Sequence, residues 1–204
     1  MKKASLLVTL SALLMTHAVF SADTYVFDRN HSSIGFLIRH LFTKVPGKFT
    51  DFSGKIVFDE DDPKQSMVEV TIKAASVNTS NAARDKDLRS SNFFDVARFP
   101  EIIFKSKSVK RTGENTADVT GELTMHGVTK EVVLRAEFNG KGKGPGPEGK
   151  AVSGSEVMTT VTGWDAKATL QRSDFGLTWN QMIEGTQVLG DDVEVELHVE
   201  ADKQ

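Results

Sequence analysis

Apolar and polar residues alternate along almost the whole chain, and this alternation constrains the fold more than any other feature of the sequence. A two-residue period places successive side chains on opposite faces of a β-strand, which gives each segment one apolar and one polar face. The clearest segment is 193–200, whose odd-numbered residues are Val or Leu and whose even-numbered residues are Glu or His. The pattern predicts an all-β protein built from half-buried antiparallel strands.

Turn signals divide the alternating pattern into eight segments. These segments lie at residues 33–39, 52–59, 68–74, 101–109, 117–125, 132–138, 158–170 and 193–200. His126-Gly127 separates two of them and has the length of a two-residue hairpin turn. The glycine-rich stretch 140–149 (GKGKGPGPEG) is expected to form the longest flexible loop and no strand. Residues 81–88 (NAARDKDL) depart from the alternation and predict a short helix inserted after the third or fourth strand.

Eight antiparallel strands usually close into a barrel, whose interior either fills with side chains or holds one small ligand. We therefore expect an eight-stranded antiparallel β-barrel with a short helical insertion. A two-sheet sandwich is the competing architecture, because the same alternation serves both folds. The sequence shows no internal repeat and no second domain, so residues 22–204 are expected to form a single domain.

The N-terminal residues have the layout of a secretory signal peptide. Two lysines precede the apolar stretch 6–15, and Val19 and Ser21 stand at the minus-three and minus-one positions of a cleavage site. The apolar stretch is too short to cross a bilayer. We therefore expect residues 1–21 to be a signal peptide cleaved near 21–22. The mature protein is then expected to be periplasmic and without an integral membrane segment.

Composition and motifs exclude several classes of function. The chain contains no cysteine, which excludes disulfide bonds and a lipoprotein anchor. Its formal net charge is −3 with both signs interspersed, so it offers no basic surface for nucleic acid. No two histidines have the spacing of a metal site, and the sequence lacks a G-x-S-x-G turn and a phosphate-binding glycine loop. We therefore expect no catalytic residue, no metal and no cofactor, and we expect the protein not to be an enzyme.

The aromatic residues are mostly Phe: thirteen Phe accompany one Tyr and two Trp. Phe carries no polar atom, which suits a dry interior, and the apolar face of each strand must point inward for a barrel to close. The residues expected to line an apolar ligand cavity are Phe36, Ile38, Phe52, Ile56 and Phe58 from the strands, with Phe93 and Phe94 from the insertion. A core filled by its own Phe side chains has the same composition, so composition alone does not separate the two.

Two charged clusters interrupt the pattern. The first contains Arg84 and Arg89 close to several Phe residues, as a lid or a site for a ligand's polar head group needs. The alternative is that these arginines pair with Asp85 or Asp95 and only fix the helix. The second cluster is 172–177 (RSDFGL), which is expected to be architectural.

Four segments carry a resemblance to a known family. They are 31–40 (HSSIGFLIRH), 84–100 (RDKDLRSSNFFDVARFP), 121–132 (GELTMHGVTKEV) and 172–177 (RSDFGL). Together with the strand pattern, which covers essentially the whole mature chain, they resemble the YceI-like polyisoprenoid-binding periplasmic proteins. The family's arginine-leucine-arginine-serine motif corresponds to Arg84, Leu88, Arg89 and Ser90, and its aromatic-proline step to Phe99-Pro100.

The resemblance implies an extended, lipocalin-like barrel that binds a long polyprenyl or other alkyl-chain lipid in its interior. We therefore expect a lipid carrier or storage protein, linked to isoprenoid quinone metabolism, transport or the stress response. A filled barrel that binds a partner or protects against stress is the alternative, and an enzyme acting on a bound lipid is the next. The sequence leaves open the identity of the lipid and whether the protein forms a homodimer.

Overall fold

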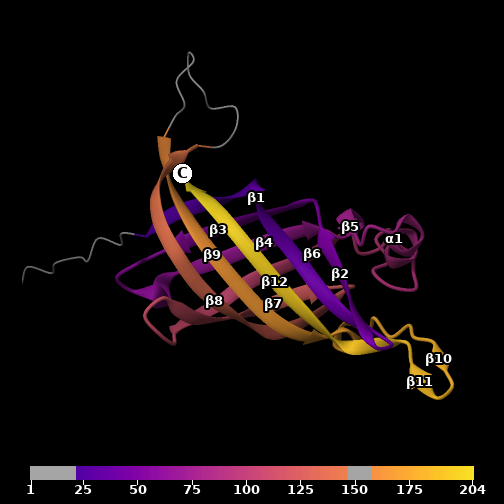
Figure 1. Cartoon of the computed structure of the whole chain (residues 1–204). Coiled ribbons are helices and arrows are strands. Elements are labelled where there is room, and N and C mark those ends of the chain that lie inside the picture. The colour runs from indigo at the N-terminus through magenta and orange to yellow at the C-terminus, as the bar shows by residue number, and fades with distance from the viewer. Residues whose placement is uncertain (1–21, 147–157) are drawn as a thin grey trace, which may run out of the picture.

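The computed structural model describes residues 22–146 and 158–204, so the predicted signal peptide 1–21 lies outside it. The strands are β1 (Asp23–His40), β2 (Thr43–Phe49), β3 (Phe52–Phe58), β4 (Met67–Lys73), β5 (Val77–Asn78), β6 (Glu101–Arg111), β7 (Thr116–Met125), β8 (Val128–Pro145), β9 (Met158–Gln171), β10 (Met182–Ile183), β11 (Thr186–Gln187) and β12 (Leu189–Lys203). The described helices are α1 (Ala82–Arg89) and the short 3-10 helices η1 (Pro63–Gln65), η2 (Ala74–Ser76) and η3 (Arg172–Phe175) (Figure 1).

Eight of the strands close into an antiparallel barrel. Their spatial order is β12, β9, β8, β7, β6, β4, β3 and β1, and pairing between β12 and β1 completes the ring. This closing ladder runs from Tyr25 opposite Lys203 to His40 opposite Leu189. The predicted all-β barrel is confirmed, and the competing sandwich is wrong because the first and last strands leave no free edge between two sheets.

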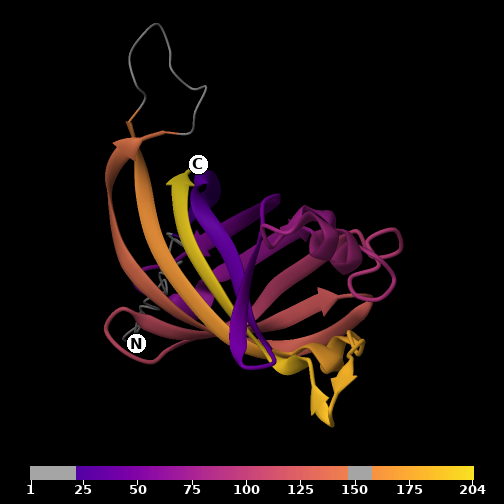
Figure 2. The same cartoon turned by 45° about the vertical axis from the view of Figure 1, so that its right-hand side comes forward.

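On the edge opposite β12, β1 pairs with two short strands. The N-terminal part of β1 pairs with β3, and its C-terminal part pairs with β2. A bend at Thr50 and Asp51 separates β2 from β3. The short strand β5 pairs with the end of β2 next to this bend. The insertion that carries α1 lies at the end of the barrel where β2 and β5 pair (Figure 2). It follows the third barrel strand, as predicted, and the Asn81 side chain caps α1 by accepting from the Arg84 N–H.

The glycine-rich stretch is the main error of the sequence prediction. Residues 140–145 continue β8 and pair with β9 as far as Pro145 opposite Met158, whereas residues 147–149 lie outside the described part of the chain. Lysines between the glycines supply side-chain contacts that glycine lacks: Lys141 pairs with Glu60 in the turn after β3, and Lys143 donates to the Thr160 hydroxyl on the neighbouring strand β9. Tertiary contacts thus override the poor strand propensity of glycine. The two-stranded ribbon that results projects beyond the barrel (Figure 1).

The inward faces of the strands supply one continuous core. Tyr25, Val77 and Phe175 are fully buried within it, and the last of these comes from η3 and not from a strand. No helix in the described residues combines the length and the apolar character that crossing a membrane requires.

Candidate ligand-binding cavities

The barrel encloses two apolar cavities, one toward each end. The helix-end cavity has a volume of 420 Å³ and lies beside α1. The loop-end cavity has a volume of 210 Å³ and lies beside the turn at residues 112–115. The residues that line the helix-end cavity include Phe36, Phe49, Phe93, Phe94, Trp179 and Val195. The residues that line the loop-end cavity include Ile56, Phe58, Phe138, Trp164 and Leu197.

A partition of buried side chains separates the two cavities. On β12, Leu197 lines the loop-end cavity and Val195, two residues earlier, lines the helix-end cavity. Residues two apart on a strand are separated by about 6.6 Å. Buried side chains that line neither cavity lie between them along their strands, as Leu123 of β7 does between Val119 and Met125. The partition is therefore thinnest at β12 and thicker at β7, where Gly121 and Leu123 both lie between the residues that line the two cavities.

The predicted lining residues divide between the two cavities. Phe36, Ile38, Phe93 and Phe94 line the helix-end cavity, and Ile56 and Phe58 line the loop-end cavity. Phe52 is 4% exposed and packs in the core, but it lines neither cavity. The residues predicted to line one cavity therefore line two. Their contacts with a ligand stay a prediction.

The two arginines of the insertion donate their hydrogen bonds to the protein itself. Arg84 donates through Nε to the Thr79 hydroxyl (2.7 Å) and through a terminal nitrogen to the Thr79 carbonyl (2.9 Å). Arg89 donates to the carbonyls of Ala75 (2.6 Å) and Val77 (2.5 Å). Arg84 lines the helix-end cavity, whereas Arg89 does not. Both guanidinium groups therefore tie the start of the insertion to its helix.

The carboxylates near these arginines have other partners, which corrects the expected pairing. Asp85 accepts from both the N–H (2.8 Å) and the hydroxyl (2.6 Å) of Thr79, and these hydrogen bonds lower the pKa of the Asp85 carboxyl below its ordinary value. Asp95 pairs instead with Arg98 at 3.4 Å. Within the described residues, neither Arg84 nor Arg89 forms an ion pair with Asp85 or Asp95. Both arginines instead contact the insertion through carbonyls and a hydroxyl, and their role as a lid or a head-group site stays a prediction.

Arg172, in the RSDFGL segment, forms the most buried of the described arginine sites. Its side chain is 7% exposed and donates to the carbonyls of Gly190 (2.8 Å), Leu177 (2.5 Å) and Trp179 (2.8 Å). Burial lowers the pKa of this guanidinium, although it is still a cation at neutral pH. The three hydrogen bonds hold the chain from Leu177 to Trp179 against β12. They thereby fix one wall of the helix-end cavity, as an architectural segment should.

Three of the segments that carry the family resemblance meet below this cavity. His126, in the turn between β7 and β8, places Nδ1 at 3.1 Å from the Phe175 carbonyl oxygen. The Phe99 ring packs edge-on against the His126 ring at 4.8 Å between centroids. Gly176 has φ of 75°, a conformation that glycine adopts without steric cost. The turn, the aromatic-proline step and η3 therefore form one joint at the base of the helix-end cavity.

An aromatic cluster lines the loop-end cavity. The Trp164 ring lies 4.8 Å from Phe58 and 4.6 Å from Phe138, and Phe58 and Phe138 are 5.4 Å apart, between ring centroids. The indole Nε1 of Trp164 is buried without a hydrogen-bond partner. At the mouth, the Asp165 carboxylate lies 2.6 Å from His198 Nδ1, and this hydrogen bond lowers the pKa of Asp165. Trp164 is not among the residues predicted to line the cavity, although its place in the predicted strand 158–170 was an available signal.

The ladder between β8 and β9 is incomplete beside the helix-end cavity. Pairing of β8 with β9 ends at Arg135 opposite Lys167, so residues 168–171 of β9 pair with β12 but not with β8. A groove of 870 Å³ follows this gap on the outside of the barrel. Its lining includes Leu170 and Val195, which also line the helix-end cavity. At this place the barrel wall is therefore a single side chain thick.

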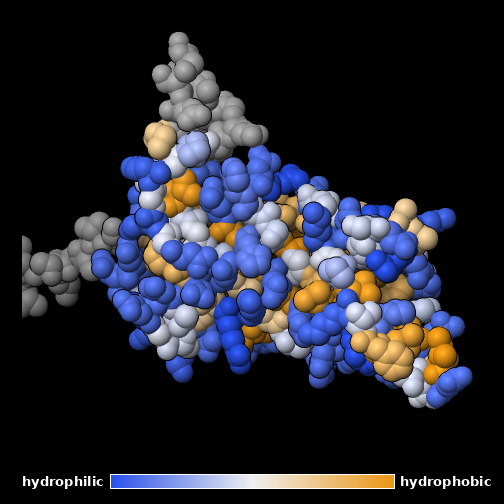
Figure 3. All heavy atoms as spheres, in the orientation of Figure 1, coloured by the Kyte–Doolittle hydropathy of each residue, from blue (hydrophilic) through white to orange (hydrophobic). Residues whose placement is uncertain are grey.

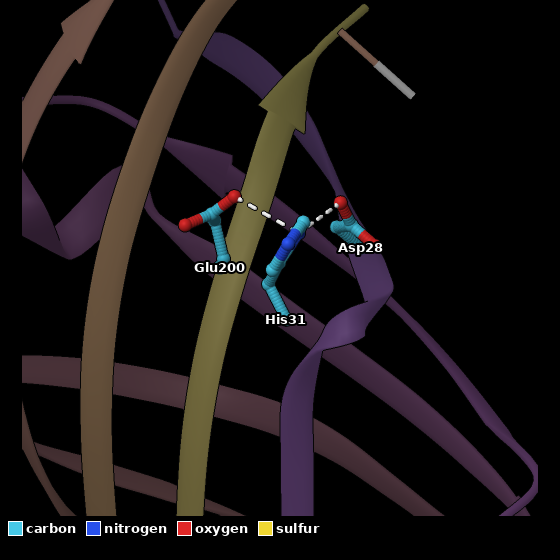
Figure 4. Close-up of side chains that lie close together, drawn as sticks. All are labelled: Asp28, His31 and Glu200. Atoms are coloured by element: carbon cyan, nitrogen blue, oxygen red, sulfur yellow. Dashed lines mark hydrogen bonds and ion pairs between the residues drawn. The ribbon is translucent and has the colours of Figure 1, made fainter. Parts of the chain in front are cut away.

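A cluster of one histidine and two carboxylates lies on the outer surface (Figure 4). His31 Nδ1 is 2.8 Å from an Asp28 oxygen and 3.5 Å from a Glu200 oxygen. The register of β1 against β12 shifts between Asp28 and Ser33, so these contacts tie the bulge to its neighbouring strand. None of the three residues lines either cavity. The cluster therefore has a structural explanation, and the expectation of no metal stays a prediction.

Comparisons with known proteins agree with this architecture. A UPF0312 protein of Pseudomonas savastanoi is 42% identical over 170 residues, which cover 82% of each chain. The crystal structure of a Campylobacter jejuni YceI protein matches with a TM-score of 0.65 and 29% identity, covering 97% of this chain and 99% of the other. A polyisoprenoid binding domain from Saccharophagus degradans has the same fold, with a TM-score of 0.62, 16% identity and 88% and 98% coverage. The model of the YceI-like domain matches residues 25–201, and the chain therefore belongs to the YceI-like family.

Proposed function

We propose that the protein is a periplasmic carrier that holds a polyisoprenoid, or another long apolar chain, inside its barrel and performs no chemistry on it. One observation carries the proposal: two apolar cavities lie end to end inside the barrel and come within one inward position of each other at β12. Small movements of partition residues such as Leu123 would join the cavities into one tunnel. A flexible prenyl chain is the ligand class that such a narrow, dry and elongated space fits best.

The energetics permit binding without any charged contact. Burying roughly 500 Å² of apolar ligand surface supplies about 12 kcal/mol. Association costs at least about 4 kcal/mol of this in lost freedom of motion. The remainder is enough for useful affinity, and it depends on the length of the chain far more than on its head group.

The arginines beside the helix-end cavity favour a neutral head group over a diphosphate. Arg84 and Arg172 line this cavity, and both donate their hydrogen bonds to backbone carbonyls or to a threonine hydroxyl. A diphosphate needs unpaired cations close by. The solved neighbour from Saccharophagus degradans is described as a polyisoprenoid binding domain, which supports the chain class but leaves the head group open.

Native mass spectrometry of the protein purified from its own cells tests this proposal. We expect a mature protein that starts at Ala22 or Asp23, recovered from the periplasm with an apolar molecule bound. The stripped protein should also bind geranylgeraniol, a neutral prenyl alcohol. A protein that carries no apolar ligand and does not bind geranylgeraniol would instead be a filled barrel, and a ligand that is chemically converted would identify an enzyme.

A further inference from the structure

Two neighbouring hairpins project from the helix end of the barrel and carry exposed apolar side chains. The turn between β1 and β2 contains Phe42, which is 95% exposed. The hairpin of β10 and β11 carries Met182 and Ile183, which are 59% and 47% exposed. A hydrogen bond from the Leu41 N–H to the Val188 carbonyl (2.8 Å) joins the two hairpins at their base. Together, Phe42, Met182 and Ile183 form a surface that we name the apolar tip.

The β10–β11 turn carries an ordinary turn glycine, Gly185 with φ of 80°, but the composition of the β1–β2 turn is unusual. Tight turns normally carry Gly, Asn or Asp, because those residues tolerate a positive φ and hydrogen-bond locally. Here Leu41 adopts φ of 50° and is followed by Phe42, so a strained aliphatic residue and an exposed ring replace the usual pair. Figure 3 shows that hydrophobic residues gather over the β10–β11 hairpin on the face in view. Such protruding apolar groups mark a contact surface.

The apolar tip is continuous with the mouth of the helix-end cavity. Trp179 precedes the β10–β11 hairpin, lines the cavity and packs against Phe93 at 5.2 Å between ring centroids. His40 and Val188, at the bases of the two hairpins, also line the cavity. None of the three residues of the tip lines it. The tip therefore lies beside the rim of the cavity, on the outside.

We propose that the apolar tip inserts into the surface of a lipid bilayer, so that a chain-like ligand passes between membrane and barrel without crossing water. The proposal rests on the lipid-carrier function above, because a prenyl chain resides in membranes. The exposed apolar side chains agree, since binding to a membrane surface strengthens with the apolar area that is buried below the head groups. Charge is close to balanced at the tip: Lys44 pairs with Glu194 (2.5 Å), and the remaining charges are Arg39 beside the β1–β2 turn and Glu184 on the β10–β11 hairpin. Binding is therefore expected to come from the apolar side chains and to depend little on anionic head groups.

Co-sedimentation of the mature protein with vesicles of phosphatidylethanolamine and phosphatidylglycerol tests this proposal. The triple variant Phe42→Ser/Met182→Ser/Ile183→Ser removes the tip. The matched control Met67→Ser/Met158→Ser removes two side chains that are equally exposed, at 57% and 55%, outside the tip. We expect the triple variant to bind vesicles at least tenfold more weakly, and the control to bind within twofold of the unmodified protein. Transfer of a fluorescent prenyl lipid out of the vesicles should slow by a similar factor.

The affinity for dissolved farnesol separates failure of this proposal from failure of the carrier function. Because the tip lines no cavity, farnesol should bind the triple variant within twofold of the unmodified protein. If the triple variant misfolds, Phe42→Ser alone decides, and it should weaken vesicle binding at least threefold. Unchanged vesicle binding by either folded variant overturns the proposal. A protein that ignores vesicles but loses self-association in sedimentation velocity when the tip is removed also overturns it, because the tip would then bind a second copy. Absence of farnesol binding in the unmodified protein would instead refute the carrier function.

Discussion

The two cavities of the barrel are both apolar, but different parts of the sequence build them. The loop-end cavity is enclosed by inward rows of the strands and is lined by the aromatic cluster of Phe58, Phe138 and Trp164. The helix-end cavity is bounded largely by irregular segments: the insertion, η3 and the chain that follows it. Its wall depends on hydrogen bonds from arginines to backbone carbonyls. Packing of side chains thus shapes one cavity, and a few polar contacts shape the other.

This difference predicts which substitutions destabilise the wall of each cavity. A wall made by strand pairing has its backbone polar groups satisfied by the sheet, so only volume and charge on its inner face matter. An irregular wall leaves carbonyls that need side-chain donors, so removing one donor leaves several buried acceptors unpaired. Substitutions in the two regions should therefore differ in kind as well as in size.

The largest effect is expected from a charge in the aromatic cluster. Phe58→Glu places a carboxylate between Phe138 and Trp164, where it has no partner, and should destabilise the protein by about 4 kcal/mol or empty it of lipid. Lys55→Glu, on the exposed face of the same strand, is the control and should change stability by less than about 0.5 kcal/mol. Urea unfolding of the two variants measures the difference. Equal stability of the two would mean that Phe58 does not face a dry interior.

Loss of the buried guanidinium is expected to be next in size. Arg172→Met keeps much of the side-chain volume but leaves the carbonyls of Gly190, Leu177 and Trp179 without their donor. We expect a loss of about 3 kcal/mol, together with a change in the fluorescence of Trp179. Arg98→Met, at a side chain that is 73% exposed, is the control and should change stability by less than about 0.5 kcal/mol. A Trp179 signal that does not change in Arg172→Met would show that other contacts fix this wall.

The sequence predicted the strand-built part of the molecule better than the irregular part, for a physical reason. Alternation identified the eight barrel strands because one face of each strand must be apolar. It did not reveal that Arg89 bonds to the carbonyls of Ala75 and Val77, since backbone acceptors have no signature in a sequence. Nor did it reveal the partition at Leu123, because the division of the interior depends on which side chains meet across the barrel. The strand at 140–145 escaped prediction because its stability comes from contacts with β9 and Glu60.

Arg89→Ala tests whether this arginine shapes the fold or binds the ligand's head group. Both of its carbonyl partners would lose a charged donor, so we expect destabilisation by about 2 kcal/mol and a lower melting temperature. Affinities for geranylgeraniol and for geranylgeranyl diphosphate should change by the same factor. A selective loss of diphosphate binding, with the melting temperature unchanged, would make Arg89 a head-group residue.

Enlarging the partition between the cavities should separate long ligands from short ones. Leu123 is 9% exposed and lines neither cavity, so Leu123→Phe adds volume between them. A chain that occupies both cavities must displace this side chain, whereas a chain that fills one cavity need not. We expect roughly tenfold weaker binding of a forty-carbon prenyl alcohol, which is about 1.4 kcal/mol, and less than about a twofold change for farnesol. Equal losses for both lengths would mean that the cavities do not join when a ligand binds.

The smallest expected effect is a difference in acid sensitivity between the two ends. Thr79 donates two hydrogen bonds to the Asp85 carboxylate and holds the pKa of Asp85 below its ordinary value of 3.8. A carboxyl whose pKa is lower in the folded state stabilises that state above the ordinary pKa, and this contribution is lost as the pH falls through the folded pKa. The melting temperature of the unmodified protein should therefore exceed that of Asp85→Asn by a constant margin above about pH 5, and the margin should shrink below about pH 4. Asp61→Asn, in an exposed turn near the loop end, is the matched control for the loss of one carboxylate outside the insertion. If the margin for Asp85→Asn were the same at pH 3 as at pH 7, the charge of Asp85 would not contribute to holding the insertion. The helix-end wall would then depend on its arginines alone.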